Sequence, residues 1–416
     1  MSDPLKRLAD KKVDRVRDSL QRRHGKERRF RTYGLLSIFF AVAFLTLILA
    51  TIFSSGFKAF VSTEVKMTFV VDSKNHQSAR RMIRNKLREE FSNVTSRVER
   101  RQLYGIVSTE SEYILQEQIE SQLGDQPKVI SLWLPAGDRF NQYHKGSLKK
   151  DEVSGFKSRE VDWYKALDNE QRIRTVFNWR FFTGGDSRNP EVAGIAGSLT
   201  GSFFTLLLTL ILSFPIGVGA AIYLEEYAPK NRITEFIEIN INNLAAVPSI
   251  VFGLLGLAIF LNVLGLPRST PIVGGLVLTL MTLPTIIISS RASLKAVSPS
   301  IRDAALAMGA SRTQVVFHHV VPQALPGMFT GSIIGMAQAL GETAPLLMIG
   351  MVAFIVDVPG GFFDAATVLP VQIYLWSENP ERGFIELTSA AIMVLLAFLF
   401  LMNGVALYLR RKLERK

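Results

Sequence analysis

Long apolar runs alternate with polar segments along the chain. Six runs are long enough to cross a hydrocarbon core about 30 Å thick, and they cover residues 33–53, 196–223, 240–264, 272–290, 326–354 and 386–409. The first run is too long for the apolar core of a signal peptide, and no small-residue cleavage motif follows it. The pattern therefore predicts a retained anchor helix and an all-α polytopic membrane protein with six transmembrane helices.

The polar segment between the first two runs, residues 57–194, has the pattern of a small separate domain. Two short stretches, Val65–Val71 and Val129–Leu134, predict strands. Three segments have apolar positions at helical spacing and predict helices: residues 77–101, 110–123 and 161–176. We expect a small α+β insertion on the outer side of the membrane. It contains no catalytic pattern, so a rigid spacer or a docking surface is the simplest interpretation.

Basic residues are concentrated at the two ends of the chain. Residues 1–32 contain twelve Lys and Arg, and residues 410–416 contain five. Lys and Arg in short flanks remain on the cytoplasmic side, so both termini are predicted to be cytoplasmic, which agrees with an even number of spans. Apart from Phe30, no aromatic residue lies among the N-terminal charges, so they have no aromatic platform on which bases could stack. The charges therefore favour attraction to anionic membrane lipid over a nucleic-acid partner.

Composition excludes several kinds of chemistry. The 416 residues include no Cys and five His, and the formal net charge is +12. Disulfides, thiolate metal sites and a Cys nucleophile are thereby excluded, and no H-E-x-x-H metal motif is present. No G-x-x-x-x-G-K-[ST] motif occurs either. We expect neither a catalytic residue nor a metal site on this chain, and no ATP hydrolysis through a P-loop.

The segment between the fourth and fifth apolar runs predicts two short helices that meet at a glycine. Pro299 suits the first turn of a helix, and Gly309 can adopt the positive φ that ends it. Ser311 and Gln314 have the spacing of a capping box that starts a second helix, which Pro322 is expected to close. The surrounding basic residues place this loop in the cytoplasm.

This loop resembles the EAA loop of ABC-importer permeases, whose pattern is E-A-A-x3-G-x9-I-x-L-P. Asp303, Ala304, Ala305, Gly309 and Pro322 fall on that pattern in register, with Asp303 in place of Glu. In that family the loop docks into a separate ATPase. The resemblance implies a coupling loop over residues 291–325. Within this loop, the residues that couple the chain to its ATPase would be Asp303, Ala304, Ala305 and Gly309. The resemblance also implies that ATP and Mg are bound by that partner and that this chain holds no cofactor. The alternative is a helical hairpin that serves packing alone.

A carboxylate lies within the fifth apolar run. Gln338 and Glu342 are four residues apart and would share one face of a helix, with Thr343 beside them. Pro345 lacks the N–H that would reach the carbonyl of Gly341, so that carbonyl is predicted to be free near Glu342. An ionisable group in the apolar zone is costly and is a candidate for a substrate path. The alternative is a carboxylate that hydrogen-bonds a neighbouring span and fixes packing. Glycines in the same run, Gly331, Gly335 and Gly341, predict close approach of another helix.

Four stretches resemble the A-type permease subunit of the Pst phosphate ABC importer: residues 341–347 (GETAPLL), Tyr223–Ala228, Asn243–Gly253 and Leu283-Pro284. The resemblance implies a MetI-like permease core over residues 195–410. The remaining regions are a basic N-terminus (1–32), a first transmembrane helix (33–56), the insertion (57–194) and a tail (411–416). It also implies a bacterial inner-membrane transport subunit, not an enzyme, that forms half of a path for inorganic phosphate. Its partners would be a second homologous permease (PstC-like), an ATPase dimer (PstB-like) and an external phosphate-binding protein (PstS-like).

The phosphate path is the least determined part of this prediction. Some phosphate permeases carry Arg where this chain has Gln338 and Ile288. Arg291 is the nearest replacement, and Asn243 is a further candidate. A lone anion beside a phosphate path would repel the substrate, so we expect Glu342 to pair with Arg291 or with a cation of the second permease. Two alternatives remain: a permease of the same fold for another oxyanion such as sulfate or molybdate, and a non-transporting membrane scaffold or sensor.

Overall fold

The structure is a computed structural model that describes residues 3–71, 78–94, 96–122, 128–148 and 156–414. It divides into two compact units, Met1–Ser54 and Ser55–Lys416. Helix α1 (Asp3–Gly56) accounts for the described part of the first unit. Its apolar part lies in a helical stretch, Arg23–Phe60, that is long and apolar enough to span a membrane. The first predicted span is therefore confirmed as a helix.

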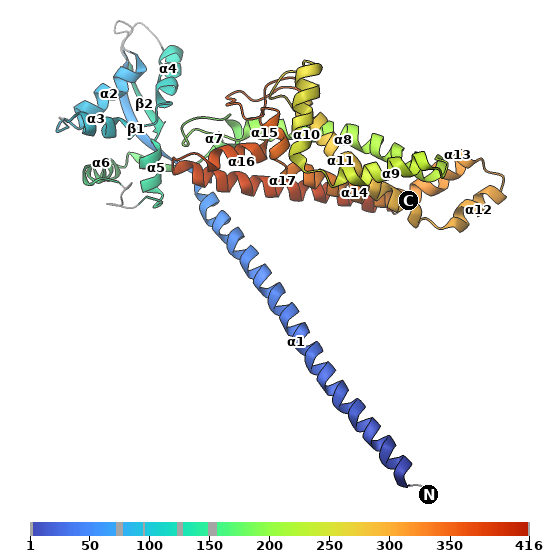
Figure 1. Cartoon of the computed structure of the whole chain (residues 1–416). Coiled ribbons are helices and arrows are strands. Elements are labelled where there is room, and N and C mark those ends of the chain that lie inside the picture. The colour runs from blue at the N-terminus through green and yellow to red at the C-terminus, as the bar shows by residue number, and fades with distance from the viewer. Residues whose placement is uncertain (1–2, 72–77, 95, 123–127, 149–155, 415–416) are drawn as a thin grey trace. The chain divides into compact units, whose positions relative to one another are not determined.

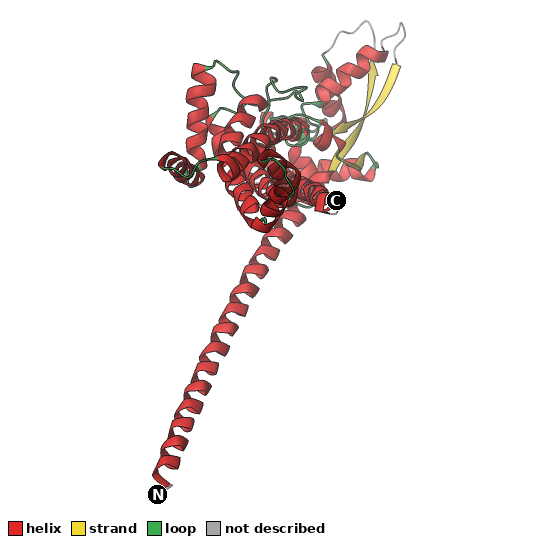
Figure 2. Cartoon of the chain, turned by 90° about the vertical axis from the view of Figure 1, so that its right-hand side faces the viewer, coloured by secondary structure: helices red, strands yellow, loops and turns green. Residues whose placement is uncertain are grey.

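The insertion combines a small sheet with short helices, as predicted. Its elements in chain order are η1 (Phe57–Phe60), β1 (Val61–Val71), α2 (Ala79–Glu90), α3 (Arg97–Tyr104), α4 (Ser111–Gln122), β2 (Lys128–Pro135), α5 (Asp138–His144), α6 (Ser158–Asn169), β3 (Ile173–Phe177) and α7 (Trp179–Thr183). Among the described residues, the three strands form one antiparallel sheet with the order β2-β1-β3. Figure 2 shows this sheet in yellow among helices.

Alternation on β1 determines which face of the sheet is covered. Val65, Met67, Phe69 and Val71 are buried, whereas Lys66 and Val70, which alternate with them, are exposed. The first three of these buried side chains join one apolar cluster with residues from the helices, including Ile83 and Leu87 of α2 and Trp163 and Leu167 of α6. This period of two is the reason that the segment forms a strand with one solvated face.

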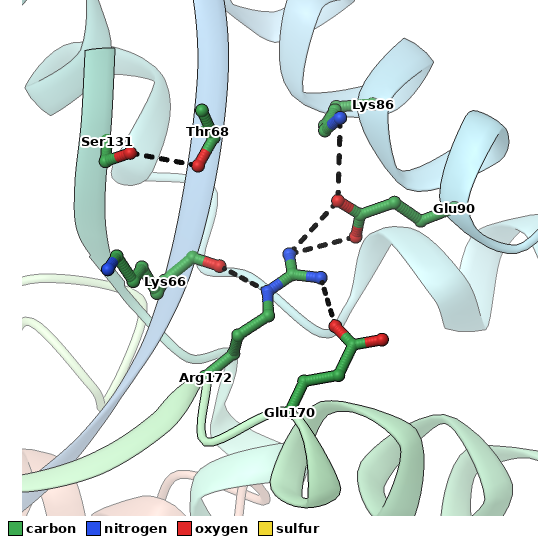
Figure 3. A network of polar contacts seen from close by, with 7 residues as sticks. All are labelled: Lys66, Thr68, Lys86, Glu90, Ser131, Glu170 and Arg172. Carbon is green, nitrogen blue, oxygen red and sulfur yellow. Dashed lines mark hydrogen bonds and ion pairs between the residues drawn. The ribbon is translucent and has the colours of Figure 1, made fainter. Parts of the chain in front are cut away.

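An ion-pair network on Arg172 fastens the turn between α6 and β3. Its guanidinium lies 3.0 Å from Glu90 of α2 and 3.1 Å from Glu170, and its Nε donates to the carbonyl of Lys66 on β1. Figure 3 shows these contacts, together with Lys86 beside Glu90. Three elements of the insertion thus meet at one side chain.

Two of the helices predicted in the insertion have different bounds. The helix expected over residues 77–101 is two helices, α2 and α3, and residues 77 and 95 lie outside the described residues. The helix expected over 161–176 ends at Asn169, because Gln171 turns the chain with a φ of 54° and the next residues pair with β1. The helix expected over 110–123 is α4, and residue 123 lies outside the described part.

The rest of the chain is helical (Figure 1). Its elements are α8 (Ala196–Ile222), η2 (Tyr223–Tyr227), α9 (Arg232–Ala245), α10 (Ser249–Gly256), η3 (Leu257–Val263), α11 (Pro271–Ala296), α12 (Pro299–Ala307), α13 (Arg312–Gln314), η4 (Val315–Val320), α14 (Val321–Gly341), α15 (Ala344–Met348), α16 (Leu369–Ser377) and α17 (Gly383–Glu414). The elements η2, η3 and η4 are π-helical turns.

Six spanning segments are present only if a bent helix pair counts as one. In the described residues, five helices are long and apolar enough to cross a membrane, and the pair Arg232–Ala245 and Ser249–Val263 is bent by 101°. The third span expected over 240–264 is therefore present only as a bent helix pair, because the chain turns just before Pro248, whose missing N–H and ring oppose a continuous helix. The fifth span expected over 326–354 is wrong at its end, since α14 stops at Gly341.

Small residues let the long helices pack closely. α11 packs against both α8 and α14. A Cβ on Gly331 of α14 would collide with the side chain of Ser289 on α11, so the predicted close approach at Gly331 is confirmed. At Gly335 the nearest atom to such a Cβ is 3.7 Å away, and at Gly341 no described atom lies within 4 Å. The prediction is therefore wrong for Gly341.

Candidate functional site

The local structure of the loop between α11 and α14 follows the sequence pattern closely. Gly309 has a φ of 88°, as predicted from its position after a helix. Ser311 and Gln314 form a reciprocal capping box, with hydrogen bonds of 3.3 and 2.8 Å. Pro322 was expected to close the second helix, and this is wrong: it lies in the first turn of α14, and one helical run continues from Arg312 to Gly341. The π-helical turn η4 directly precedes it, and such turns accommodate interruptions of regular helix hydrogen bonding.

The four candidate coupling residues lie together at one end of the permease core. Asp303 and Ala304 are exposed on α12, whereas Ala305 is buried in a cluster with Val315 and Val316 of η4. Gly309 follows directly after this helix and is exposed. The hairpin therefore packs on itself through Ala305 and presents Asp303 and Ala304 outward.

Arg302 fixes α12 to the ends of two long helices. Its guanidinium lies 2.7 Å from a carboxylate oxygen of Glu226 in η2, the turn that ends α8. The same group donates to the carbonyls of Leu294 and Val297 at the end of α11, at 3.0 and 2.7 Å. Carbonyls at a helix C-terminus lack partners within the helix, so a cation there is well placed. Helix α12 is thus held by a charged side chain against the ends of α8 and α11.

Arg291 pairs with carboxylates of this same region. Its guanidinium lies 2.7 Å from Glu238 of α9 and 3.4 Å from Glu225 of η2, and Lys295 lies 3.7 Å from Glu225. The proposed pairing of Arg291 with Glu342 is therefore wrong. Ser289 lies beside Gly331, and Glu342 is eleven residues farther along the chain. At 1.5 Å per helical residue, that is roughly 16 Å along the helix axis, away from Arg291.

Glu342 occupies a break between two helices and not a continuous span. α14 ends at Gly341, Glu342 has extended backbone angles (φ −81°, ψ 124°), and α15 begins at Ala344 with Pro345 in its first turn. Proline suits the first turn of a new helix, which explains why the chain restarts there. The helical face that Glu342 was predicted to share with Gln338 therefore does not form. Interrupted helices at membrane depth are typical of substrate sites in transporters.

The remaining path candidates lie on α9, on α14 and at the break that follows α14. Glu342 and Thr343 are half-buried at the break, and Gln338 is exposed on α14. Asn243 is exposed near the end of α9, just before the 101° bend. The bend and the break belong to adjacent elements, since α10 packs against α15. Arg291 lies apart from them, among Glu225 and Glu238.

The sequence analysis did not identify the carboxylates that pair with Arg291 and Arg302. Glu225 and Glu226 belong to a motif noted for its resemblance alone. Arg291 was considered as a phosphate-path residue and a partner of Glu342, and Arg302 only as one of the basic residues that indicate orientation. A usable signal was present: two adjacent carboxylates directly after a span, facing a short loop rich in cations. Glu238 gives no such signal, because its pairing depends on how α9 lies against α11.

Two family profiles match the chain. One, described as a binding-protein-dependent transport system inner membrane component, matches residues 213–415. The other, described as a domain of unknown function (DUF3333), matches residues 17–153. The first therefore covers the coupling loop and the Glu342 break, and the second covers most of the insertion.

Several known proteins are similar to the permease part. A probable ABC transporter permease protein, YqgI of Bacillus subtilis, is 31% identical over 239 residues, which cover 54% of this chain and 80% of the relative. The phosphate transport system permease protein PstA of Mycobacterium leprae is 32% identical over 234 residues, covering 55% of this chain and 74% of the relative. Among solved structures, a chain of the MetNI methionine ABC transporter matches 51% of this chain and 94% of its own, with 18% identity and a TM-score of 0.43.

Proposed function

The chain belongs to the ABC-transporter permease family that includes the PstA phosphate transport permeases, and from that premise we propose that it forms half of the transmembrane path of an ATP-driven importer for inorganic phosphate. It is a multi-pass inner-membrane permease subunit and not an enzyme. The observation that carries the phosphate assignment is the 32% identity to a phosphate permease over 74% of that relative. The GETAPLL stretch at the α14–α15 break adds to it.

Transport by such a subunit requires partners. A second homologous permease would complete the path, an ATPase dimer would supply energy, and an external binding protein would deliver phosphate. ATP and Mg would be held by the ATPase. The exposed face of α12, with Asp303 and Leu306, and Met308 directly after it would be covered by that ATPase. Both termini would then lie in the cytoplasm on the same side as α12.

In the proposed path, phosphate is bound by neutral hydrogen-bond donors of this chain and by a cationic side chain of the second permease. Asn243, Gln338 and Thr343 offer amide and hydroxyl donors that can bind phosphate oxygens. Glu342 would repel the anion if it stood alone. In this proposal it holds a cationic side chain of the second permease at the helix break, and that cation attracts phosphate.

The test is transport by the reconstituted complex. The chain, its permease and ATPase partners and the binding protein would be placed in proteoliposomes, and uptake of labelled phosphate would be followed with and without ATP. We expect ATP-dependent uptake that excess sulfate or molybdate does not suppress. Suppression by either anion would indicate another oxyanion as substrate. ATPase association without any uptake would favour the scaffold or sensor.

A further inference from the structure

A continuous series of ion pairs joins the coupling helix to α9. We infer that these pairs, Arg302–Glu226, Arg291–Glu225 and Arg291–Glu238, make α9 move with the coupling loop, so that α9 transmits the ATPase stroke to the bend beside Asn243. Arg291 and Glu238 are positioning residues in this role. The inference rests on the proposed transport function and assigns a task to side chains outside the loop itself.

The first link connects α12 to the turn η2. Arg302 is held by Glu226 and by two terminal carbonyls of α11, so a displacement of α12 pulls on both elements. Only 11% of the Glu226 side chain is exposed. Ion pairs and hydrogen bonds of a partly buried guanidinium are little screened by salt, and the planar group fixes their geometry.

The second link connects η2 and α11 to α9. Glu225 is adjacent to Glu226 in sequence, yet it contacts Arg291 and Lys295 of α11. Arg291 then reaches Glu238 on α9 at 2.7 Å. Its side chain is 14% exposed, and it bridges one carboxylate from each of two elements. One guanidinium therefore joins α11, η2 and α9.

The attachment of α9 to α11 depends strongly on the Arg291–Glu238 ion pair, because α9 has few packing contacts of its own. Every residue of α9 is described, and none is buried, although the helix lies against α11. Within this chain, α9 contacts the neighbouring apolar cluster only through partly buried side chains such as Ile241, so its charged contact with α11 contributes a large share of its attachment to that helix. At its far end α9 stops at Ala245, where the 101° bend separates it from α10. Helix α9 can therefore pivot at the bend after Ala245, while the part that contains Glu238 moves with α11.

The test is the coupling between ATP hydrolysis and transport in the reconstituted complex. Glu238→Gln removes the charge that ties α9 and leaves α12 and Arg302 intact. We expect ATPase activity to persist while phosphate imported per ATP hydrolysed falls several-fold. Glu235→Gln is the matched control, because Glu235 is an exposed carboxylate of the same helix. It should leave the ratio unchanged.

A second measurement separates loss of coupling from loss of structure. The chain has no Cys, so spin labels can be placed at Asn240→Cys on α9 and Ala296→Cys on α11, both exposed positions. The distance between them should be equal with and without ATP in the otherwise native protein, and should change with ATP in Glu238→Gln. The inference would be overturned if Glu238→Gln imported as much phosphate per ATP hydrolysed as the native protein. It would also be overturned if the distance between the labels were the same with and without ATP in the native protein and in Glu238→Gln. Failure of the native complex to import phosphate would instead overturn the proposed function.

Discussion

The ammonium of Lys145 in the insertion lies 3.4 Å from the carboxylate of Glu386 at the start of α17, and both side chains are buried. Ser147 donates to the other carboxylate oxygen at 2.6 Å and accepts from Lys58 at 3.0 Å. Burial lowers the pKa of Lys145, against the attraction of Glu386. The join between the insertion and the permease core thus depends on charges removed from water.

Breaking this pair should destabilise the join strongly. Glu386→Gln leaves the Lys145 charge buried without its anion, at a cost of about 3–5 kcal/mol. The thermal unfolding midpoint of the purified protein should fall, and the insertion should become more sensitive to protease. Glu99→Gln is the control, because Glu99 pairs with a largely exposed Arg159 and such pairs contribute about 1 kcal/mol or less. Equal effects of the two variants would contradict the importance of burial.

Two further carboxyl groups at this join should make its stability depend on pH. Burial and the neighbouring Glu381 and Glu386 raise the pKa of Asp138 to about 6. Burial also raises the pKa of Glu191 to about 7, against a hydrogen bond from Ser108. Unfolded carboxyl groups titrate near pH ~4, so the folded protein retains protons that the unfolded chain has lost. The stability from these groups is present below about pH 4 and is lost as the pH rises through about 6 and 7.

The unfolding midpoint should therefore fall between about pH 5 and about pH 8. The double variant Asp138→Asn, Glu191→Gln keeps both groups neutral, so it should flatten this dependence and be more stable than the native protein at the higher pH. Asp162→Asn, at an exposed position of the insertion, is the control and should leave the profile unchanged. The measurement is thermal unfolding across the pH range. Parallel profiles for the native protein and the double variant would refute this assignment.

Close packing between α11 and α14 can be tested with one methyl group. Gly331→Ala introduces a Cβ that collides with Ser289, and such overpacking costs about 1–3 kcal/mol. Gly341→Ala adds the same group where no described atom lies within 4 Å. Thermal unfolding should show a clear loss for the first variant and little change for the second. A similar loss in both would mean that the helices do not meet at Gly331.

Sequence patterns predicted the elements whose signal is local. Apolar length revealed the spans, and the glycine and capping-box spacings placed Gly309 and Ser311 correctly. The bend before Pro248 was missed because the apolar run continues through it, and mean hydropathy does not report a change of direction. The break at Glu342 was missed for the same reason, since apolar residues follow it.

The contacts of the site could not be predicted from one sequence. Arg291 and Glu225 are 66 positions apart, and Arg291 and Glu238 are 53 apart. Their pairing follows from how α9 and η2 lie against α11, which no local pattern determines. The sequence prediction paired Arg291 with Glu342 because no pattern shows which residues of α11 and α14 lie at the same level. Its true partners, Glu225 and Glu238, could not be identified without that information.

The turn at Gly309 should matter through its backbone alone. Its φ is 88°, and no described atom lies within 4 Å of a Cβ built there. Gly309→Val is therefore strained by its conformation and not by a collision, at a cost of about 1–2 kcal/mol. Uptake in the reconstituted complex should fall while membrane insertion persists. Gly309→Asn should retain more activity, because Asn tolerates this conformation. Equal uptake by both variants and the native protein would remove the turn from coupling.

Glu342 should act independently of Arg291, because Arg291 lies on α11 at the level of the Gly327–Gly331 stretch of α14, whereas Glu342 follows the end of α14. Glu342→Gln keeps the shape of the side chain and removes the charge that would hold a cation of the second permease. We expect normal association with the ATPase and loss of most phosphate uptake, with partial retention in the charge-preserving Glu342→Asp. Arg291→Gln should lower uptake through coupling, so the double variant should show both losses added on a free-energy scale. A double variant no worse than either single one would show that the two residues act as one unit. Full uptake by Glu342→Gln would make this carboxylate a packing element.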